Sequence, residues 1–159
     1  MKECDLNVHN KKIADLDIQL EIFLSIIWRN HFVFLNRETK NLNIKGTQVP
    51  CLMVISKHPG ITQEDIANIF QIDKGFIARI VRELEENELL YRTVDPDNRR
   101  KHHIFLTENG ENIIPKIKNI NKKWEKLVCE GLNEDESLKL IEFMNLLAQN
   151  SLEKIKNQS

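Results

Sequence analysis

Three consecutive cations, Arg99, Arg100 and Lys101, follow the turn-forming segment Asp-Pro-Asp-Asn at 95–98. Like charges at this spacing repel one another, a cost that is tolerable at a solvated tip if a polyanion later lies against them. The phosphate backbone of a nucleic acid is such a polyanion, and an arginine at a turn can enter a narrow minor groove. An ordinary surface turn shows the same run of cations, so the interpretation needs a second basic feature.

That second feature lies in the segment 73–88. Projected at about 100° per residue, its apolar residues cluster on one side, while Gly75, Arg79 and Arg82 lie on the other with Ala78 at the flank. The small residues would let the backbone approach a groove wall while the arginines reach base edges or phosphates. Glu83, Glu85 and Glu86 in the second half of the segment leave a solvated charged face as the alternative.

Helix caps predict the elements that would position these residues. Thr62, with Asp65 three residues on, forms a capping box that starts a helix running to about Phe70. Asp73 is a good N-cap for the next helix, which continues to about Glu88. Two short helices joined by a brief turn form the pattern of a helix-turn-helix, although any helical hairpin would share it.

Extended segments at 89–94 and 101–106 flank the turn that carries the cations, so we expect a β-hairpin directly after the helix-turn-helix. Long amphipathic helices are predicted on both sides of this central unit. Spacings of three and four predict one at 12–41 and a short helix at 48–57. Caps predict two more at 107–131 and 133–154. Their apolar surface favours pairing with a second copy, folding back on the central unit being the alternative.

The composition fits one globular domain, with 41% hydrophobic and 30% charged residues. The formal net charge of −1 does not reveal a local basic patch, because it sums the whole chain. Cys4, Cys51 and Cys129 lie outside any CxxC pattern, which favours neither disulfides nor a zinc site, and the last two are expected to be buried in helices. No apolar run is long enough to cross a membrane, so we expect a soluble, cytoplasmic protein.

Three segments together resemble the MarR family of winged-helix transcriptional regulators, namely HPGITQEDIANIF, DKGFIARIVRELEENELL and DPDNRRKHHIFLTENG. The family typically shows Asp-x-Arg and then Leu-Thr-x-x-Gly in its wing, which places Arg100 at the family's wing arginine and Asn98 at its usual aspartate. That aspartate normally holds the wing arginines, so Asp95 or Asp97 would have to supply the missing charge. Glu88 stands where the family often has a glycine that closes the recognition helix.

The resemblance covers nearly the whole chain and implies a mainly α fold, a winged helix-turn-helix with a small β-hairpin wing. It implies a single domain at 1–159, a DNA-binding lobe at 47–106, and dimerisation helices at 10–46 and 107–156. The expected function is that of a transcriptional regulator, a repressor that binds a palindromic operator as a homodimer without a cofactor. The expected contacts with double-stranded DNA come from Lys74, Gly75, Ala78, Arg79, Arg82, Asn98, Arg99, Arg100 and Lys101.

The resemblance also implies that a small, often anionic aromatic effector binds between the dimer region and the lobe and releases the DNA. Trp28, Arg29, His31 and Met53 are the candidate contacts, because an aromatic wall beside a cation suits such a ligand. Core packing for Trp28 and Met53, and a surface role for Arg29 and His31, are the structural alternatives.

Other functions stay open. A redox-responsive regulator of the same fold would use a cysteine, but Cys4 has acidic neighbours rather than the electropositive setting that a thiolate needs. A metal sensor is disfavoured because His102 and His103 point to opposite faces of a strand. No combination of nucleophile, acid and base predicts an enzyme. A winged helix that binds only other proteins would lack the cationic face.

Overall fold

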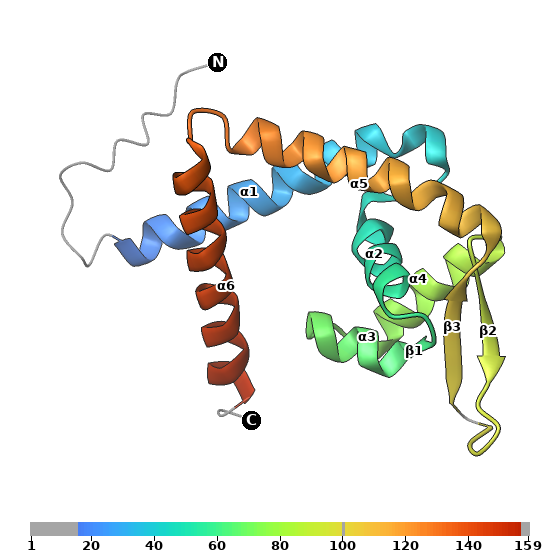
Figure 1. Cartoon of the computed structure of the whole chain (residues 1–159). Coiled ribbons are helices and arrows are strands. Elements are labelled where there is room, and N and C mark those ends of the chain that lie inside the picture. The colour runs from blue at the N-terminus through green and yellow to red at the C-terminus, as the bar shows by residue number, and fades with distance from the viewer. Residues whose placement is uncertain (1–15, 100, 157–159) are drawn as a thin grey trace. The chain divides into compact units, whose positions relative to one another are not determined.

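The computed structural model describes residues 16–99 and 101–156, so Cys4 and Arg100 lie outside the described residues (Figure 1). The described residues divide into two compact units, the first extending to Ile120 and the second beginning at Asn121. The helices are α1 Leu16–Glu38, α2 Val49–Lys57, α3 Gln63–Phe70, α4 Lys74–Glu86, α5 Glu108–Val128 and α6 Glu134–Lys156, with 3₁₀ turns η2 Lys40–Leu42 and η3 Gly46–Gln48. The strands are β1 Ile61–Thr62, β2 Leu90–Val94 and β3 His102–Leu106.

Both predicted caps of the helix-turn-helix are present. The Thr62 hydroxyl accepts from the Asp65 amide while the Asp65 carboxylate accepts from the Thr62 amide, which is the reciprocal capping box. The Asp73 carboxylate accepts from the Phe76 amide at 3.0 Å and starts α4. Between the helices, Gln71 adopts a left-handed conformation with φ of 51°. The turn thus lets α3 end and α4 start within three residues.

The sheet has three strands rather than the expected two. Ile61 and Thr62 pair antiparallel with Ile104 and His103, so the strand order is β1-β3-β2. In Figure 1 this sheet lies beside α2, α3 and α4. The sequence does not predict β1, because two residues before a helix cap carry no alternation pattern. The extra strand joins the hairpin to the start of α3.

The segment Leu-Thr-Glu-Asn-Gly joins the sheet to the end of α4. The Thr107 hydroxyl donates to the Glu88 carbonyl at 2.6 Å and accepts from the Gly110 amide at 3.0 Å. Gly110 is buried, and a Cβ there would lie 2.0 Å from the carbonyl oxygen of Leu89. Glycine is therefore needed because the first turn of α5 packs directly on the backbone after α4.

The first helix ends earlier than the predicted Asn41, at Glu38. The buried Thr39 hydroxyl that follows lies within hydrogen-bond distance of the carbonyl oxygens of Leu35 and Ile44, which share its one proton. The expectation that Cys129 is a buried helix residue is also wrong. Cys129 follows the end of α5 in a turn and is partly exposed, whereas Cys51 is buried in α2 as expected.

The second unit consists of the last part of α5 and α6. Asn133 and Glu136 form the predicted capping box, with the Asn133 amide donating to Glu136 at 2.8 Å and the Glu136 amide donating to Asn133 at 3.0 Å. No described side chain from Asn121 to Lys154 is buried, although α6 carries many large apolar residues.

Candidate nucleic-acid interface

The two faces of α4 differ as the sequence predicts. Its inner face is buried in the first unit through Ile77, Ile80, Val81 and Leu84. The outer face is exposed and carries the predicted contacts, with Ala78 half-buried beside them: Lys74, Gly75, Arg79 and Arg82. An apolar back and a small-residue, cationic front fit a helix that enters a DNA groove.

The glutamates of α4 do not all lie in this outer face. Glu83 accepts from Lys45 at 2.9 Å and from the buried Gln48 amide at 2.8 Å, and the hydrogen bond from Lys45 is the main reason that its pKa is lowered. Glu85 is paired with Arg92 of β2. These contacts direct two of the three negative charges toward neighbouring elements.

The two arginines of α4 are held differently. The Arg79 guanidinium lies 5.2 Å from the centre of the Phe76 ring, a cation–π contact that leaves its donors exposed. Arg82 lies 3.7 Å from Glu86 one turn on, in an exposed pair that contributes little to stability. Both guanidinium groups can therefore exchange their present surroundings for phosphate or base edges at low cost.

A groove of about 350 Å³ separates the starts of α3 and α4 from the wing turn. It brings together three predicted contact residues, Lys74, Asn98 and Lys101. Sequence analysis missed the other residues of its wall, which are Thr62, Gln63, Glu64 and His102. The capping box at Thr62 was the available signal, because the amides at a helix N-terminus favour an anion such as phosphate.

One acid opposes this role of the groove. Glu64 accepts from Lys74 at 2.6 Å, and both side chains are well exposed. The pair places one predicted DNA contact beside a carboxylate that would repel phosphate. The affinity of the groove for an anion is therefore lower than its count of cations suggests.

Asp95 organises the wing turn through backbone amides. One of its carboxylate oxygens accepts from the amides of Asp97 and Asn98, at 2.9 and 3.0 Å. The Lys101 amide donates to the Asn98 carbonyl at 2.8 Å and closes the turn. The other oxygen of Asp95 contacts His103. Because Arg100 lies outside the described residues, the expectation that Asp95 or Asp97 holds the wing cations stays a prediction. Arg99 and Lys101 are exposed on this turn.

The four candidate effector contacts lie on two helices, Trp28, Arg29 and His31 on α1 and Met53 on α2. Trp28 is 63% exposed on α1 and packs edge-to-face on Phe32. Arg29 is exposed, and Met53 is half-buried in α2. Partial burial lowers the pKa of His31. Their role as a ligand site stays a prediction.

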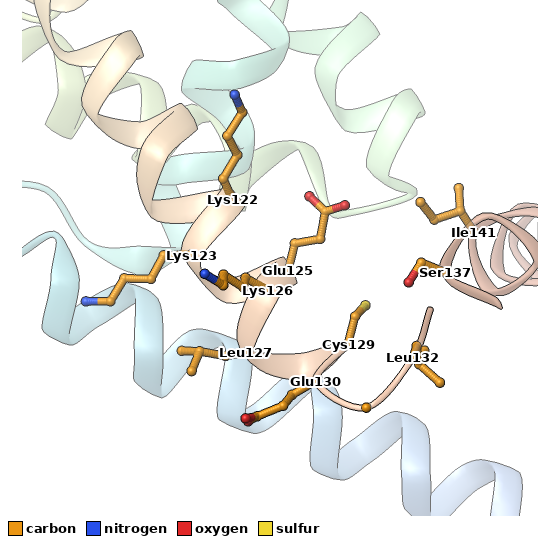
Figure 2. A pocket seen from close by; sticks show the side chains of 11 residues that line it. Lys122, Lys123, Glu125, Lys126, Leu127, Cys129, Glu130, Leu132, Ser137 and Ile141 are labelled. Atoms are coloured by element: carbon orange, nitrogen blue, oxygen red, sulfur yellow. The ribbon is translucent and has the colours of Figure 1, made fainter. Parts of the chain in front are cut away.

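A cavity of about 830 Å³ lies at the turn between α5 and α6 (Figure 2). Leu127, Leu132 and Ile141 form its apolar wall, and Lys122 and Lys126 lie along its α5 side. It is an open hollow whose lining also includes the charged residues Lys123, Glu125 and Glu130.

The remaining chemistry is sparse in the described part of the chain. Burial raises the pKa of the Cys51 thiol to about 12, so it stays protonated and does not suit a redox sensor. Within residues 16–99 and 101–156 no three His, Cys, Asp or Glu side chains are grouped to bind a metal. The same residues contain no helix long and apolar enough to span a bilayer.

Comparisons with known proteins identify the family. The MarR family profile matches residues 44–102. A crystal structure of MarR is 37% identical, superposes with a TM-score of 0.78, and the alignment covers 94% of this chain and 97% of that one. The chain belongs to the MarR family. Its members are transcription regulators rather than enzymes, so this protein is a DNA-binding transcriptional regulator.

Two further relatives agree. The HTH-type transcriptional regulator YybA of Bacillus subtilis, itself uncharacterized, is 27% identical over 101 residues, which are 64% of this chain and 67% of that protein. A MarR-family regulator from Listeria monocytogenes, solved in complex with a 26mer DNA, is 25% identical with a TM-score of 0.71 and 91% of each chain covered. As a MarR-family fold, the protein uses α3 and α4 as its helix-turn-helix and β2 and β3 as its wing.

Proposed function

We propose that this MarR-family regulator is a repressor that binds a palindromic operator as a homodimer, with α4 in the major groove and the wing over an adjacent minor groove. The proposed contacts are those predicted from the sequence: Lys74, Gly75, Ala78, Arg79, Arg82, Asn98, Arg99, Arg100 and Lys101. The observation that most strongly supports the proposal is the distribution of charge on α4. Glu83 and Glu85 are paired with neighbouring elements, while Arg79 stays exposed on the outer face.

The groove between α3 and the wing supports a phosphate contact. Its wall combines residues at the N-terminus of α3 with Lys74 and Lys101, so a helix N-terminus and two lysines border one groove. A phosphate there would fix the register of α4 without reading sequence. The base edges would be read by the arginines of α4.

Exposed apolar surface supports the homodimer. Large apolar side chains are more than a third exposed along α1 from Leu20 to Val33 and along α6 from Leu138 to Leu152. Monomeric proteins rarely leave such extended apolar surface in water, and most oligomers pair identical copies. A twofold dimer presents two α4 helices, which requires two inverted half-sites in the DNA.

Release by an effector is the remaining part of the proposal. A small, anionic aromatic compound would contact Trp28, Arg29, His31 and Met53 and bind best to a dimer whose α4 helices have the wrong spacing for DNA. Such a ligand acts only through this difference in affinity between the two conformers. Repression would then end when the ligand accumulates in the cytoplasm.

Selection of bound duplexes from a random DNA pool tests the proposal. The expected result is an inverted repeat whose half-sites lie about one helical turn, or 10 base pairs, apart. Sedimentation of the protein with the selected duplex should then give two chains per site. Failure to enrich any sequence, or enrichment of a site without inverted symmetry, would contradict the proposed operator.

A further inference from the structure

His103 on β3 contacts two oxygen atoms, one through each nitrogen of its ring. Nδ1 lies 2.7 Å from the Gly60 carbonyl oxygen, and Nε2 lies 2.8 Å from a carboxylate oxygen of Asp95. A carbonyl and a carboxylate accept hydrogen bonds but donate none. A neutral imidazole carries one proton, so only the doubly protonated ring can donate to both atoms.

These two oxygens belong to segments far apart in the sequence. Gly60 lies in the turn between α2 and β1, while Asp95 begins the wing turn. The second oxygen of Asp95 holds the amides of Asp97 and Asn98, so a shift of this carboxylate moves the turn that carries the wing cations. His103 therefore connects the wing turn with the turn that precedes the helix-turn-helix.

We propose that His103 is a positioning residue for operator binding, whose doubly protonated ring holds the wing turn in place, so that DNA affinity falls when the ring loses a proton. The inference rests on the proposed contact between the wing and DNA. His103 is distinct from the predicted DNA contacts because its ring faces Gly60 and Asp95 rather than the groove.

The charges around the ring act in opposite directions. The hydrogen bond to Gly60 and then the contact with Asp95 raise the pKa of His103, while nearby Lys101 lowers it. The charge of His103 contributes to the lowered pKa of Asp65 on α3, after the hydrogen bonds from Thr62. Thr93, the partner of His103 on β2, carries no charge. The net direction is upward from the ordinary value of about 6.5.

This direction fixes the sign of the pH dependence. Because the pKa of His103 is raised in the folded protein, both hydrogen bonds of its ring are present below about pH 6.5. One of them is lost as the pH rises through the higher pKa of the folded protein. Operator affinity should therefore be greatest on the acidic side of neutrality and decline toward pH 8.5. Asp95 stays ionised throughout, because His103 and the two turn amides lower its pKa.

Titration of operator affinity between pH 6 and pH 8.5 at constant ionic strength tests the inference. The wild type should lose at least about fivefold in affinity across this range, which is the lower end of usual coupling. His103→Gln offers one NH₂ nitrogen in place of two ring nitrogens on opposite sides of the imidazole, so it cannot reach both oxygens at once. It should bind at pH 6 about as weakly as the wild type does at pH 8.5, with little dependence on pH.

Asp95→Asn separates positioning from general stability. Its carbonyl oxygen can still accept from the turn amides, while its NH₂ group can donate to Nε2 of a neutral His103 whose Nδ1 proton serves Gly60. This variant should keep the wing in place at pH 8.5. Its operator affinity should therefore stay high across the whole pH range. A purely structural role of His103 predicts no such gain at high pH.

The matched control is His58→Gln, which removes an exposed imidazole from the same turn as Gly60 and should retain the wild-type profile. Urea unfolding at each pH identifies variants that bind weakly because they are unfolded. A folded His103→Gln that keeps the wild-type pH slope would overturn the inference. Absence of operator binding by the wild type at any pH would instead refute the proposed function.

Discussion

The first unit, up to Ile120, and the second unit, from Asn121, differ in the burial of their apolar residues. All fully buried apolar side chains of the described residues lie between Phe34 and Ile117. Beyond Asn121 no described side chain is buried, although α6 exposes Phe143 to 63% and several leucines to more than a third. The first unit thus has a core within one chain, whereas α6 has the apolar residues of a core without the burial.

The difference in burial indicates different roles for the two regions. Burial within the lobe fixes α4 and the wing relative to each other, which DNA recognition requires because side chains must reach specific groove atoms. The exposed apolar residues of α6 are stabilised only when another surface covers them. We infer that this second surface sets the distance between two lobes, and therefore the spacing of the operator half-sites.

The largest expected effect is a loss of folding stability in the first unit. Gly110→Ala places a methyl group 2.0 Å from the carbonyl oxygen of Leu89, which must displace the backbone between α4 and β2. The free energy of unfolding should fall by about 3 kcal/mol or more, at the upper end of overpacking costs. Urea unfolding followed by circular dichroism measures it, with the exposed neighbour Asn109→Ala as control. A loss no greater than that of the control would contradict the close packing.

The next largest effect is on the proposed dimer, without a change in the DNA-binding lobe. Leu147→Asp places a charge on the apolar side of α6, and the dimer should weaken by about 3 kcal/mol because an interface cannot cover an unpaired carboxylate. Gln149→Asp is the control, since residues two apart lie on roughly opposite sides of a helix. Sedimentation at increasing concentration distinguishes them. Equal dissociation of both variants would mean that this side of α6 is not the contact surface.

A smaller effect concerns the charged surface of the lobe. Glu64→Gln removes the carboxylate that pairs with Lys74 and leaves an amide of the same shape. Operator binding should tighten by up to about 1 kcal/mol, the upper end for exposed pairs, because Lys74 becomes available to phosphate and a repulsive charge is removed. Titration of labelled operator measures the change. Unchanged or weaker binding would place Lys74 away from the DNA.

The smallest expected effect stabilises the lobe. Glu88 has a left-handed backbone with φ of 57°, at the position where the family often has glycine. Glu88→Gly should raise the free energy of unfolding by roughly 0.5–1 kcal/mol, because relief of the strained backbone exceeds the entropic cost of glycine. Thermal unfolding should show a higher midpoint, and a lower one would mean that the Glu88 side chain stabilises the turn in another way.

Local patterns predicted much of the lobe. The caps at Thr62 and Asp73 depend on residues three apart, so the sequence alone could locate them, and the periodicity of α4 correctly separated its buried and exposed faces. Contacts between distant residues could not be predicted in the same way. The pairing of Asp95 with His103 depends on the curvature of the wing turn, and the pairing of Glu64 with Lys74 depends on the angle between α3 and α4.

The strand β1 and the role of Asp95 show the same limit. Two residues form β1 only because β3 lies beside them, and no local propensity distinguishes them from a loop. Asp95 or Asp97 was expected beside the wing cations because they are neighbours in the chain. The contacts of the Asp95 carboxylate with the turn amides and with His103 were not indicated by any local pattern.

The most direct test of the account measures operator affinity against salt for the wild type, Arg82→Ala and Arg100→Ala, with the exposed Lys57→Ala as a control outside the proposed contacts. Each arginine variant should bind more weakly by about 1–3 kcal/mol. The wild-type affinity should fall steeply with salt, and loss of a phosphate contact should reduce that slope by about one. Wild-type affinity and slope in both arginine variants would contradict the assignment of α4 and the wing as the DNA-binding surface.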